Sequence, residues 1–373
     1  MKIKIMLFKI IIRSCFTIPN CTLFRVVVLL NSVGLCSQEF DGEYVTLNVG
    51  DPGDNIPVTY RTSGSKMVIS WKESGVCEGS SDLKAWFGVA KGRRYNLNTI
   101  NDHAFYRVKK ERPRTAKTYI PKGYNLVNKY PLIINLHGYT GNAEHQNGYF
   151  PLQSRADLNG FIFCIPEGLE DSGNKQRWNA IDACCGSRND LPDDSKYLRN
   201  LIQTVMNKYS VDKNHIYCMG FSNGAMMSYR MAIDHSDILA GIIVISGISY
   251  KDKKYAPKFP INVLHIHGTT DSNYNGTTLG QLSFYFADTP SVEENIKNWA
   301  EYSNCNEMTM TKKAKDLVMH LSGKETTVIS YKNANNKCVV ELWKVNGGIH
   351  YEQYSKEAKE SVVDWILDHP KVE

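Results

Sequence analysis

The pentapeptide Gly220-Phe221-Ser222-Asn223-Gly224 constrains the fold of this chain more than any other feature of its sequence. It follows an apolar run over residues 215–219 that has the composition of a buried strand. Glycines two positions either side of a serine allow a strand to turn sharply into a helix, because no Cβ atom obstructs the turn. No proline interrupts residues 225–232, so that helix can follow. The pattern predicts a nucleophile elbow at Ser222, which is typical of serine hydrolases.

A serine hydroxyl needs a base and an orienting carboxylate before it can act as a nucleophile. Asp271 lies in the loop after the β-like run over residues 261–267, and His350 follows the alternating run over residues 338–345 and two glycines. The chain order Ser222, Asp271, His350 is that of α/β-hydrolases, not of chymotrypsin-like or subtilisin-like proteases. We predict that Ser222 is the nucleophile, His350 the base and Asp271 the acid.

The charge that develops on the substrate oxygen also requires hydrogen-bond donors fixed in advance. In this type of fold one backbone N–H comes from the residue after the nucleophile, here Asn223. The other comes from the loop after an earlier strand, and residues 130–136 read as that strand. We predict Tyr139 as the second donor, with Thr140 as the alternative.

Three other histidines have a simpler interpretation. We expect His137, His265 and His267 to be packed and hydrogen-bonded, and not to transfer protons or bind a metal. The sequence has no C-x-x-C or H-x-x-x-H spacing, so a zinc site is a weak alternative. We therefore expect neither a metal nor a cofactor.

The chain resembles the secreted esterases grouped as polyhydroxybutyrate depolymerases and feruloyl esterases, from about residue 104 to residue 370. Eight segments carry the resemblance in order: residues 130–141, 161–168, 178–186, 193–198, 220–224, the Asp271 loop, residues 291–305 and the His350 loop. The resemblance implies an α/β-hydrolase domain over residues 104–373, with a doubly wound, mostly parallel sheet. It also implies cleavage of carboxylic esters through an acyl-enzyme, with Ser222, Asp271 and His350 as the triad.

The His350 loop departs from the family pattern. The family usually has three glycines before the histidine and a tryptophan after it, whereas this chain has Ile349 before His350 and Tyr351-Glu352 after it. The acyl preference is therefore open between feruloyl-polysaccharide and hydroxyalkanoate esters, so the substrate can be polymeric. Trp178 and Tyr139 are candidates for substrate contact, with packing inside its own loop as the alternative for Trp178.

The N-terminus predicts secretion. Residues 1–37 contain five basic and no acidic residues, and without them 39 basic and 38 acidic residues leave a net charge of +1. That balance argues against a nucleic-acid partner. The apolar core over residues 26–35 is shorter than the roughly 20 residues of a membrane span, so we predict a signal peptide cleaved near Ser37 and no stable membrane insertion. A start at Met6 and a retained anchor are the alternatives.

Residues 38–103 lie outside the resemblance. Two β-like runs, residues 44–49 and 66–71, are separated by turn-forming residues and predict a small β-rich extension. Its Trp71, Trp86 and Phe87 fit a small core better than an exposed platform for a polymer.

Seven cysteines follow residue 37, and an oxidising route of secretion favours disulfides. Cys305 follows a helix-like segment and Cys338 opens the strand before the His350 loop, so we predict a disulfide between them. Cys164 and Cys218 lie in apolar runs and are expected as buried thiols. One of the adjacent Cys184 and Cys185 is a candidate partner for Cys77.

Three functions are compatible with these residues. A secreted serine esterase fits best. A peptidase of the same fold and a polymer-binding protein without catalysis are the alternatives, and the intact set of Ser222, Asp271 and His350 argues against the last.

Overall fold

A computed structural model gives the structure of the chain over residues 44–49, 59–63, 66–80, 87–97, 105–109, 114–171, 174–185, 193–278 and 288–372. The chain divides into two compact units: residues 53–110, grouped with residues 1–33, and residues 111–373, grouped with residues 34–52. The predicted signal peptide and Cys77's side chain lie outside the residues described in this way. None of the helices within the described ranges is long and apolar enough to cross a membrane.

The smaller unit contains one antiparallel sheet. Strand β3 (Lys66–Ser80) pairs with β2 (Thr59–Ser63), β4 (Phe87–Leu97) and β5 (Phe105–Lys109). The expected boundary at residue 103 is therefore too early, because β5 completes this sheet. The side chains of Trp71, Trp86 and Phe87 lie outside the description, so the choice between core and platform stays a prediction.

The larger unit contains a ten-stranded sheet in the order β1-β6-β8-β7-β11-β12-β13-β16-β15-β14. Six central strands, from β8 to β16, are parallel, and two antiparallel strands flank them on each side. The strands are β1 (Tyr44–Val49), β6 (Arg114–Tyr119), β7 (Tyr130–Leu136), β8 (Ile162–Pro166), β11 (Val211–Phe221), β12 (Gly241–Ile245), β13 (Asn262–Gly268), β14 (Glu307–Lys315), β15 (Thr326–Lys332) and β16 (Val339–Val345). Residues 44–49, expected in the extension, pair with β6 and belong to this sheet.

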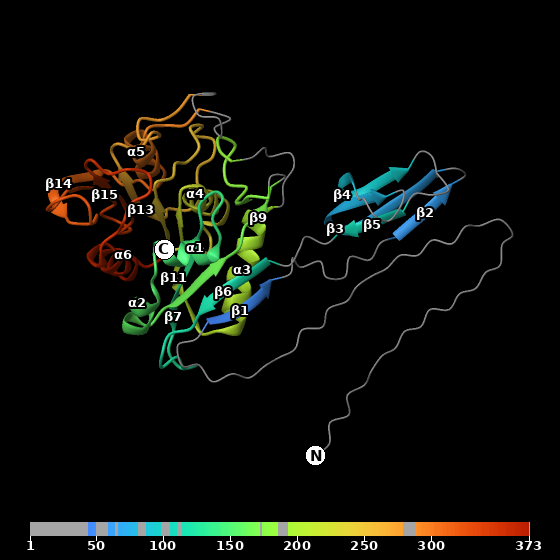
Figure 1. Ribbon diagram of the computed structural model, residues 1–373, viewed down its shortest axis with the longest axis horizontal. Coiled ribbons are helices and arrows are strands. Elements are labelled where there is room, and N and C mark those ends of the chain that lie inside the picture. The colour runs from blue at the N-terminus through green and yellow to red at the C-terminus, as the bar shows by residue number, and fades with distance from the viewer. Residues whose placement is uncertain are drawn as a thin grey trace, which may run out of the picture. The chain divides into compact units, whose positions relative to one another are not determined.

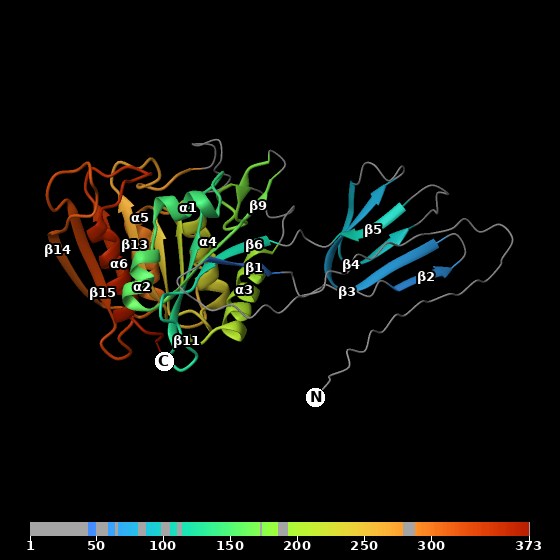
Figure 2. The same cartoon turned by 60° about the horizontal axis from the view of Figure 1, so that its bottom comes forward.

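Helices cover both faces of the sheet (Figures 1 and 2). The central strands are buried on both sides. Successive residues of β7 alternate between the two faces, because Leu132 and Ile134 join one apolar cluster and Ile133 joins the other. Helices α3 (Asp194–Lys208), α4 (Asn223–His235) and α5 (Val292–Tyr302) pack in the first cluster. Helices α1 (Ala143–Tyr149), α2 (Gln153–Asn159) and α6 (Lys356–Asp368) pack in the second. The prediction of a doubly wound, mostly parallel sheet is confirmed.

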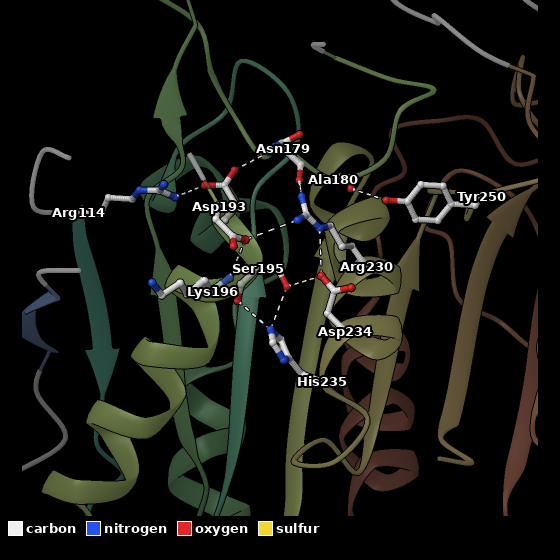
Figure 3. A network of polar contacts seen from close by, with 11 residues as sticks. Arg114, Asn179, Ala180, Asp193, Ser195, Lys196, Arg230, Asp234, His235 and Tyr250 are labelled. Carbon is white, nitrogen blue, oxygen red and sulfur yellow. Dashed lines mark hydrogen bonds and ion pairs between the residues drawn. The ribbon is translucent and has the colours of Figure 1, made fainter. Parts of the chain in front are cut away.

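A polar network ties the first helical layer together (Figure 3). Asp193 caps α3 by accepting a hydrogen bond from the backbone N–H of Lys196, at 3.1 Å. The neighbouring Asp194 is buried, where it pairs with Arg114 of β6 at 2.5 Å and accepts a hydrogen bond from the backbone N–H of Asn179. Both aspartates therefore anchor the start of α3.

Candidate active site

Ser222 lies at a strained turn between β11 and α4. Its φ of 52° and ψ of −115° fall outside the regions that most residues with a side chain adopt. A Cβ atom on Gly220 would lie 2.3 Å from the carbonyl carbon of Gly224, and one on Gly224 would lie 2.3 Å from the carbonyl oxygen of Leu136. Only glycine fits at both positions. The turn has the geometry predicted for a nucleophile elbow.

Two loops at the same edge of the sheet hold Asp271 and His350. Strands β13 and β16 are parallel neighbours, so the loops after them emerge side by side. The loops approach so closely that a Cβ atom on Gly268 would lie 2.3 Å from the carbonyl carbon of Gly348. Thr270 binds the carbonyl oxygen of Gly348 twice, through its backbone N–H at 2.9 Å and its hydroxyl at 2.6 Å. This pairing fixes the position of Asp271 relative to His350.

The structure brings the three predicted side chains into one hydrogen-bonded chain. His350 Nδ1 lies 2.6 Å from Asp271 Oδ2, and His350 Nε2 lies 3.0 Å from Ser222 Oγ. An ionised carboxylate only accepts hydrogen bonds, so Nδ1 carries the imidazole proton and Nε2 is free to accept the serine proton. The Asp271 side chain is 1% exposed, whereas the His350 side chain is 42% exposed. The acid is therefore buried while the base is accessible.

Asp271 stays ionised despite its burial. Burial by itself raises the pKa of the carboxyl, but hydrogen bonds from His267 and His350 outweigh it and hold the pKa well below its ordinary value. Asp271 thus remains a carboxylate at neutral pH.

Two backbone N–H groups beside Ser222 have no protein acceptor within the described residues: those of Tyr139 and Asn223. Thr140, the alternative, donates its N–H to the carbonyl oxygen of Gln176 at 2.8 Å. The loop of Tyr139 lies against the elbow, because a Cβ atom on Gly138 would lie 3.4 Å from Ser222 Cβ. The structure therefore favours Tyr139 over Thr140, and the oxyanion role of both N–H groups stays a prediction.

The prediction that Trp178 contacts substrate is wrong for this structure. Its side chain is fully buried, with its ring against His137 and its Nε1 donating to the carbonyl oxygen of His137 at 3.0 Å. Its backbone N–H and carbonyl oxygen both bind the side chain of Asn223, at 2.7 and 3.0 Å. Trp178 therefore joins the elbow to the loop of Tyr139. The Tyr139 side chain is half-buried and donates its hydroxyl to Asp171 Oδ2 at 3.2 Å.

His137 has the structural role that we expected. Its Nδ1 donates to the carbonyl oxygen of Gly138 at 2.8 Å, and its Nε2 accepts the backbone N–H of Gly168 at 2.9 Å. Burial lowers the pKa of His137 to about 4, so the imidazole is neutral at physiological pH. Both ring nitrogens are engaged by backbone groups.

Sequence reasoning missed one contact of Asp271. His265 and His267 are buried and hydrogen-bonded as expected, but His267 Nε2 also lies 2.9 Å from Asp271 Oδ2. The spacing H-x-x-x-D, across the end of a strand and the turn after it, was the only available signal. His267 therefore belongs to the surroundings of the candidate acid.

Aromatic side chains lie beside Ser222 and His350. Tyr351 is 43% exposed, stacks on Tyr149 with ring centroids 4.6 Å apart, and meets Phe221 edge-on at 5.4 Å. Its ring is also parallel to that of His145. Tyr351 is one of the residues at which the loop departs from the family pattern, and it offers an accessible aromatic surface next to the base.

The predicted disulfide between Cys305 and Cys338 is not formed in the structure. Both are free, buried thiols, and Cys305 directs its Sγ toward the carbonyl oxygen of Cys338, 3.4 Å away. Cys164 and Cys218 are buried free thiols, as expected. Cys184 and Cys185 are bonded to each other, which leaves neither of them for Cys77.

Comparison with known proteins agrees with the fold. Residues 126–341 match the family model described as phospholipase/carboxylesterase. Feruloyl esterase B of Piromyces equi is 27% identical over 253 residues, which cover 66% of this chain and 44% of that protein. A bifunctional acetylxylan esterase/xylanase of Neocallimastix patriciarum is 25% identical over 214 residues, or 57% of this chain and 27% of that protein.

The NocK protein of Nocardia uniformis subsp. tsuyamanensis is 32% identical over 165 residues, or 43% of this chain and 45% of that protein. The chain thus spans less than half the length of each of these curated relatives. Among solved structures, an acetyl xylan esterase from Aspergillus awamori aligns with a TM-score of 0.47 at 15% identity, over 68% of this chain and 94% of that one. The family match and the sheet together confirm the predicted α/β-hydrolase fold.

Proposed function

The chain belongs to the phospholipase/carboxylesterase family of α/β-hydrolases, and from that premise we propose that it is a serine esterase that hydrolyses carboxylic esters through an acyl-enzyme. Ser222 is the nucleophile, His350 the general base and Asp271 the group that orients it. The observation that carries this proposal is the hydrogen-bonded chain from Asp271 Oδ2 through both nitrogens of His350 to Ser222 Oγ, with contacts of 2.6 and 3.0 Å.

In the acylation step Ser222 Oγ attacks the carbonyl carbon of the ester while His350 Nε2 takes the hydroxyl proton. The resulting imidazolium is stabilised by Asp271, whose carboxylate already accepts the Nδ1–H. His350 then gives the proton to the leaving alcohol as the carbon–oxygen bond breaks, which leaves an acyl group on Ser222.

In this proposal the carbonyl oxygen carries the negative charge, and hydrogen bonds from the backbone N–H groups of Tyr139 and Asn223 stabilise it. Asn223 begins α4, so the positive end of the helix dipole adds to its N–H. Trp178 supports the arrangement by binding the Asn223 side chain and the carbonyl oxygen of His137. Water attacks the acyl-enzyme with the same groups in the same roles, and Ser222 regains its proton from His350.

The substrates proposed for this site are feruloyl-polysaccharide or hydroxyalkanoate esters. Two relatives whose names include feruloyl esterase and acetylxylan esterase support the polysaccharide class. The exposed ring of Tyr351 and the exposed Ile349, at 43% and 48%, offer an apolar surface beside His350. A planar aromatic acyl group would gain contact area on such a surface, whereas an acetyl group would not. The basic, apolar N-terminal segment supports secretion as the route to such substrates.

The test is hydrolysis of a substrate panel by the purified chain and by Ser222→Ala. The panel holds p-nitrophenyl esters of rising acyl length, methyl ferulate, an acetylated xylan and polyhydroxybutyrate, with a p-nitroanilide peptide to detect peptidase activity. The proposal predicts ester hydrolysis with the wild type alone. Equal rates with Ser222→Ala, or hydrolysis of the anilide alone, would contradict it.

A further inference from the structure

A buried file of hydrogen-bonding side chains runs from α5 to the candidate acid. Asn295 Nδ2 donates to the Tyr229 hydroxyl at 2.7 Å, and that hydroxyl lies 2.7 Å from His265 Nδ1. His265 Nε2 lies 2.8 Å from His267 Nδ1, and His267 Nε2 lies 2.9 Å from Asp271 Oδ2. All five side chains are buried. The file therefore extends the chain of Ser222, His350 and Asp271 into the core.

The acceptor at one end sets the direction of every bond. Asp271 Oδ2 and Asn273 Oδ1 can only accept, so His267 Nε2 donates to both, each at 2.9 Å. With both imidazoles neutral, His267 Nδ1 then accepts from His265 Nε2, and His265 Nδ1 accepts the Tyr229 hydroxyl proton. Each donor thus points toward Asp271, and one arrangement of protons satisfies all contacts.

We propose that His267, supported by His265 and Tyr229, is a positioning residue that keeps Asp271 ionised and aimed at His350; the proposal rests on the esterase function above. Asp271 Oδ2 receives two N–H donors, one from the base and one from His267. A buried carboxylate that loses one of its donors takes up a proton more readily. His267 therefore favours the form of the Asp271–His350 pair that holds fewer protons, which is the reactive form.

The charged and titratable groups around His267 come from three elements. His265 and Asp271 lie on its own strand and loop, and the ring of Tyr274 meets it edge-on at 5.9 Å. Lys344 of β16 is its register partner in the sheet, but its ammonium group is 2.7 Å from Glu293 of α5, and Tyr274 donates its hydroxyl to the same carboxylate. The ammonium group beside the file is thus paired with Glu293. Asp271 accepts hydrogen bonds from His267, from His350 and from the backbone N–H of Asn273, and the bond from His267 is the one that comes from the file.

The experiment compares pH profiles of kcat/KM for p-nitrophenyl acetate. His267→Leu removes the donor at similar volume, and we expect kcat to fall about tenfold or more with little change in KM. The acid limb of the profile, where kcat/KM rises from its low-pH value, should also move to higher pH, because the Asp271–His350 pair takes up a proton more easily. His267→Gln keeps an N–H donor and should return the limb toward the wild-type position. A purely structural role would lower the amount of active enzyme without moving the limb.

Two further variants make the result decisive. Tyr229→Phe removes only the hydroxyl that binds His265, and it should move the acid limb in the same direction by a smaller amount. This variant tests the proposal if His267→Leu does not fold. His235→Leu replaces a half-buried histidine outside the file and should leave the limb in place. An acid limb at the wild-type pH in both His267→Leu and Tyr229→Phe would overturn the proposal. If the wild-type protein hydrolyses no ester, that result would instead overturn the proposed esterase function.

Discussion

The described part of the chain holds two clusters of serine, histidine and aspartate, and they differ in the direction of their hydrogen bonds. In the first, the proton of Ser222 is directed to His350, whose other nitrogen donates to Asp271. In the second, Ser195 Oγ lies 2.6 Å from Asp234 Oδ2 and 2.9 Å from His235 Nε2 (Figure 3). Because the residue types are the same, a difference in reactivity between the two clusters must come from how the residues are arranged.

An arginine decides the orientation of the second cluster. Arg199 lies 3.1 Å from His235 Nδ1 and can only donate, so Nδ1 accepts and Nε2 carries the proton of the neutral ring. His235 Nε2 then donates to Ser195 Oγ, and the Ser195 hydroxyl donates a hydrogen bond to Asp234 Oδ2. The histidine cannot act as a base toward this serine, because the nitrogen that faces it is protonated.

Location separates the two serines as well. Ser195 lies in the first turn of α3 and is 2% exposed, whereas Ser222 is partly exposed at a strained turn with two unpaired N–H groups beside it. A substrate therefore has access to Ser222 and not to Ser195. We infer that the second cluster serves only to join α3 to α4.

Replacing each serine by alanine should give the largest contrast. Ser222→Ala is expected to lower kcat by on the order of 10⁴ or more, because it removes a member of a cooperative unit. Ser195→Ala should keep kcat within about twofold and cost about 1 kcal/mol of unfolding free energy, because it removes buried hydrogen bonds. Steady-state kinetics and urea unfolding of both variants test this, and a large loss of kcat in a folded Ser195→Ala would break the comparison.

The two aspartates should differ almost as much. Asp271→Asn replaces a carboxylate, which only accepts hydrogen bonds, with an amide that can also donate. This change favours the wrong tautomer of His350, so kcat should fall about 10³- to 10⁴-fold. Asp234→Asn should leave kcat near the wild-type value and affect only stability. Kinetics at saturating p-nitrophenyl acetate measure both, and a fall in kcat of similar size in the two variants would contradict the assignment.

The aromatic surface beside His350 should matter for one substrate more than for another. Tyr351→Ala is expected to lower kcat/KM for methyl ferulate by about three- to tenfold, because it removes one aromatic contact. The value for p-nitrophenyl acetate should change little, because an acetyl group is too small to cover the ring. Tyr255→Ala, which removes an aromatic ring packed against Tyr250, serves as the control. Equal losses on both substrates would show that Tyr351 does not select the acyl group.

The smallest expected effect concerns stability in the window below about pH 6.5. Burial and then the charge of Arg199 lower the pKa of His235, so below about pH 6.5 the unfolded chain takes up a proton that the folded chain excludes. Stability should therefore decrease as the pH falls through this window, and decrease less in His235→Gln. Asp271, whose folded pKa is depressed, stabilises the fold above about pH 4 and loses that contribution only at lower pH. Urea unfolding at several pH values tests this, and equal slopes in wild type and His235→Gln would contradict it.

The backbone of the candidate site could be predicted, because local sequence determines it. Gly220 and Gly224 mark the elbow, and strand-like runs end just before Asp271 and His350, which places all three at one edge of a parallel sheet. Contacts that depend on how side chains pack could not be predicted in the same way. Trp178 looked like a loop aromatic but is buried between the elbow and the Tyr139 loop.

The other errors have the same origin. The disulfide between Cys305 and Cys338 was expected from their places beside neighbouring elements, but these places do not fix the direction of each Sγ. The bond from His267 to Asp271 depends on a side-chain rotamer across a turn. The extension boundary was misplaced because the strand over residues 44–49 pairs with β6, which lies far away in sequence.

The most direct test of the central claim is mass-spectrometric mapping of the native chain after reaction with a fluorophosphonate. This reagent phosphonylates a serine that a neighbouring histidine activates. One adduct is expected, on the peptide that contains Ser222. It should be absent in Ser222→Ala and in His350→Ala and retained in Ser195→Ala. An adduct on Ser195, or no adduct on Ser222 in the folded protein, would contradict the claim that bond direction and access separate the two clusters.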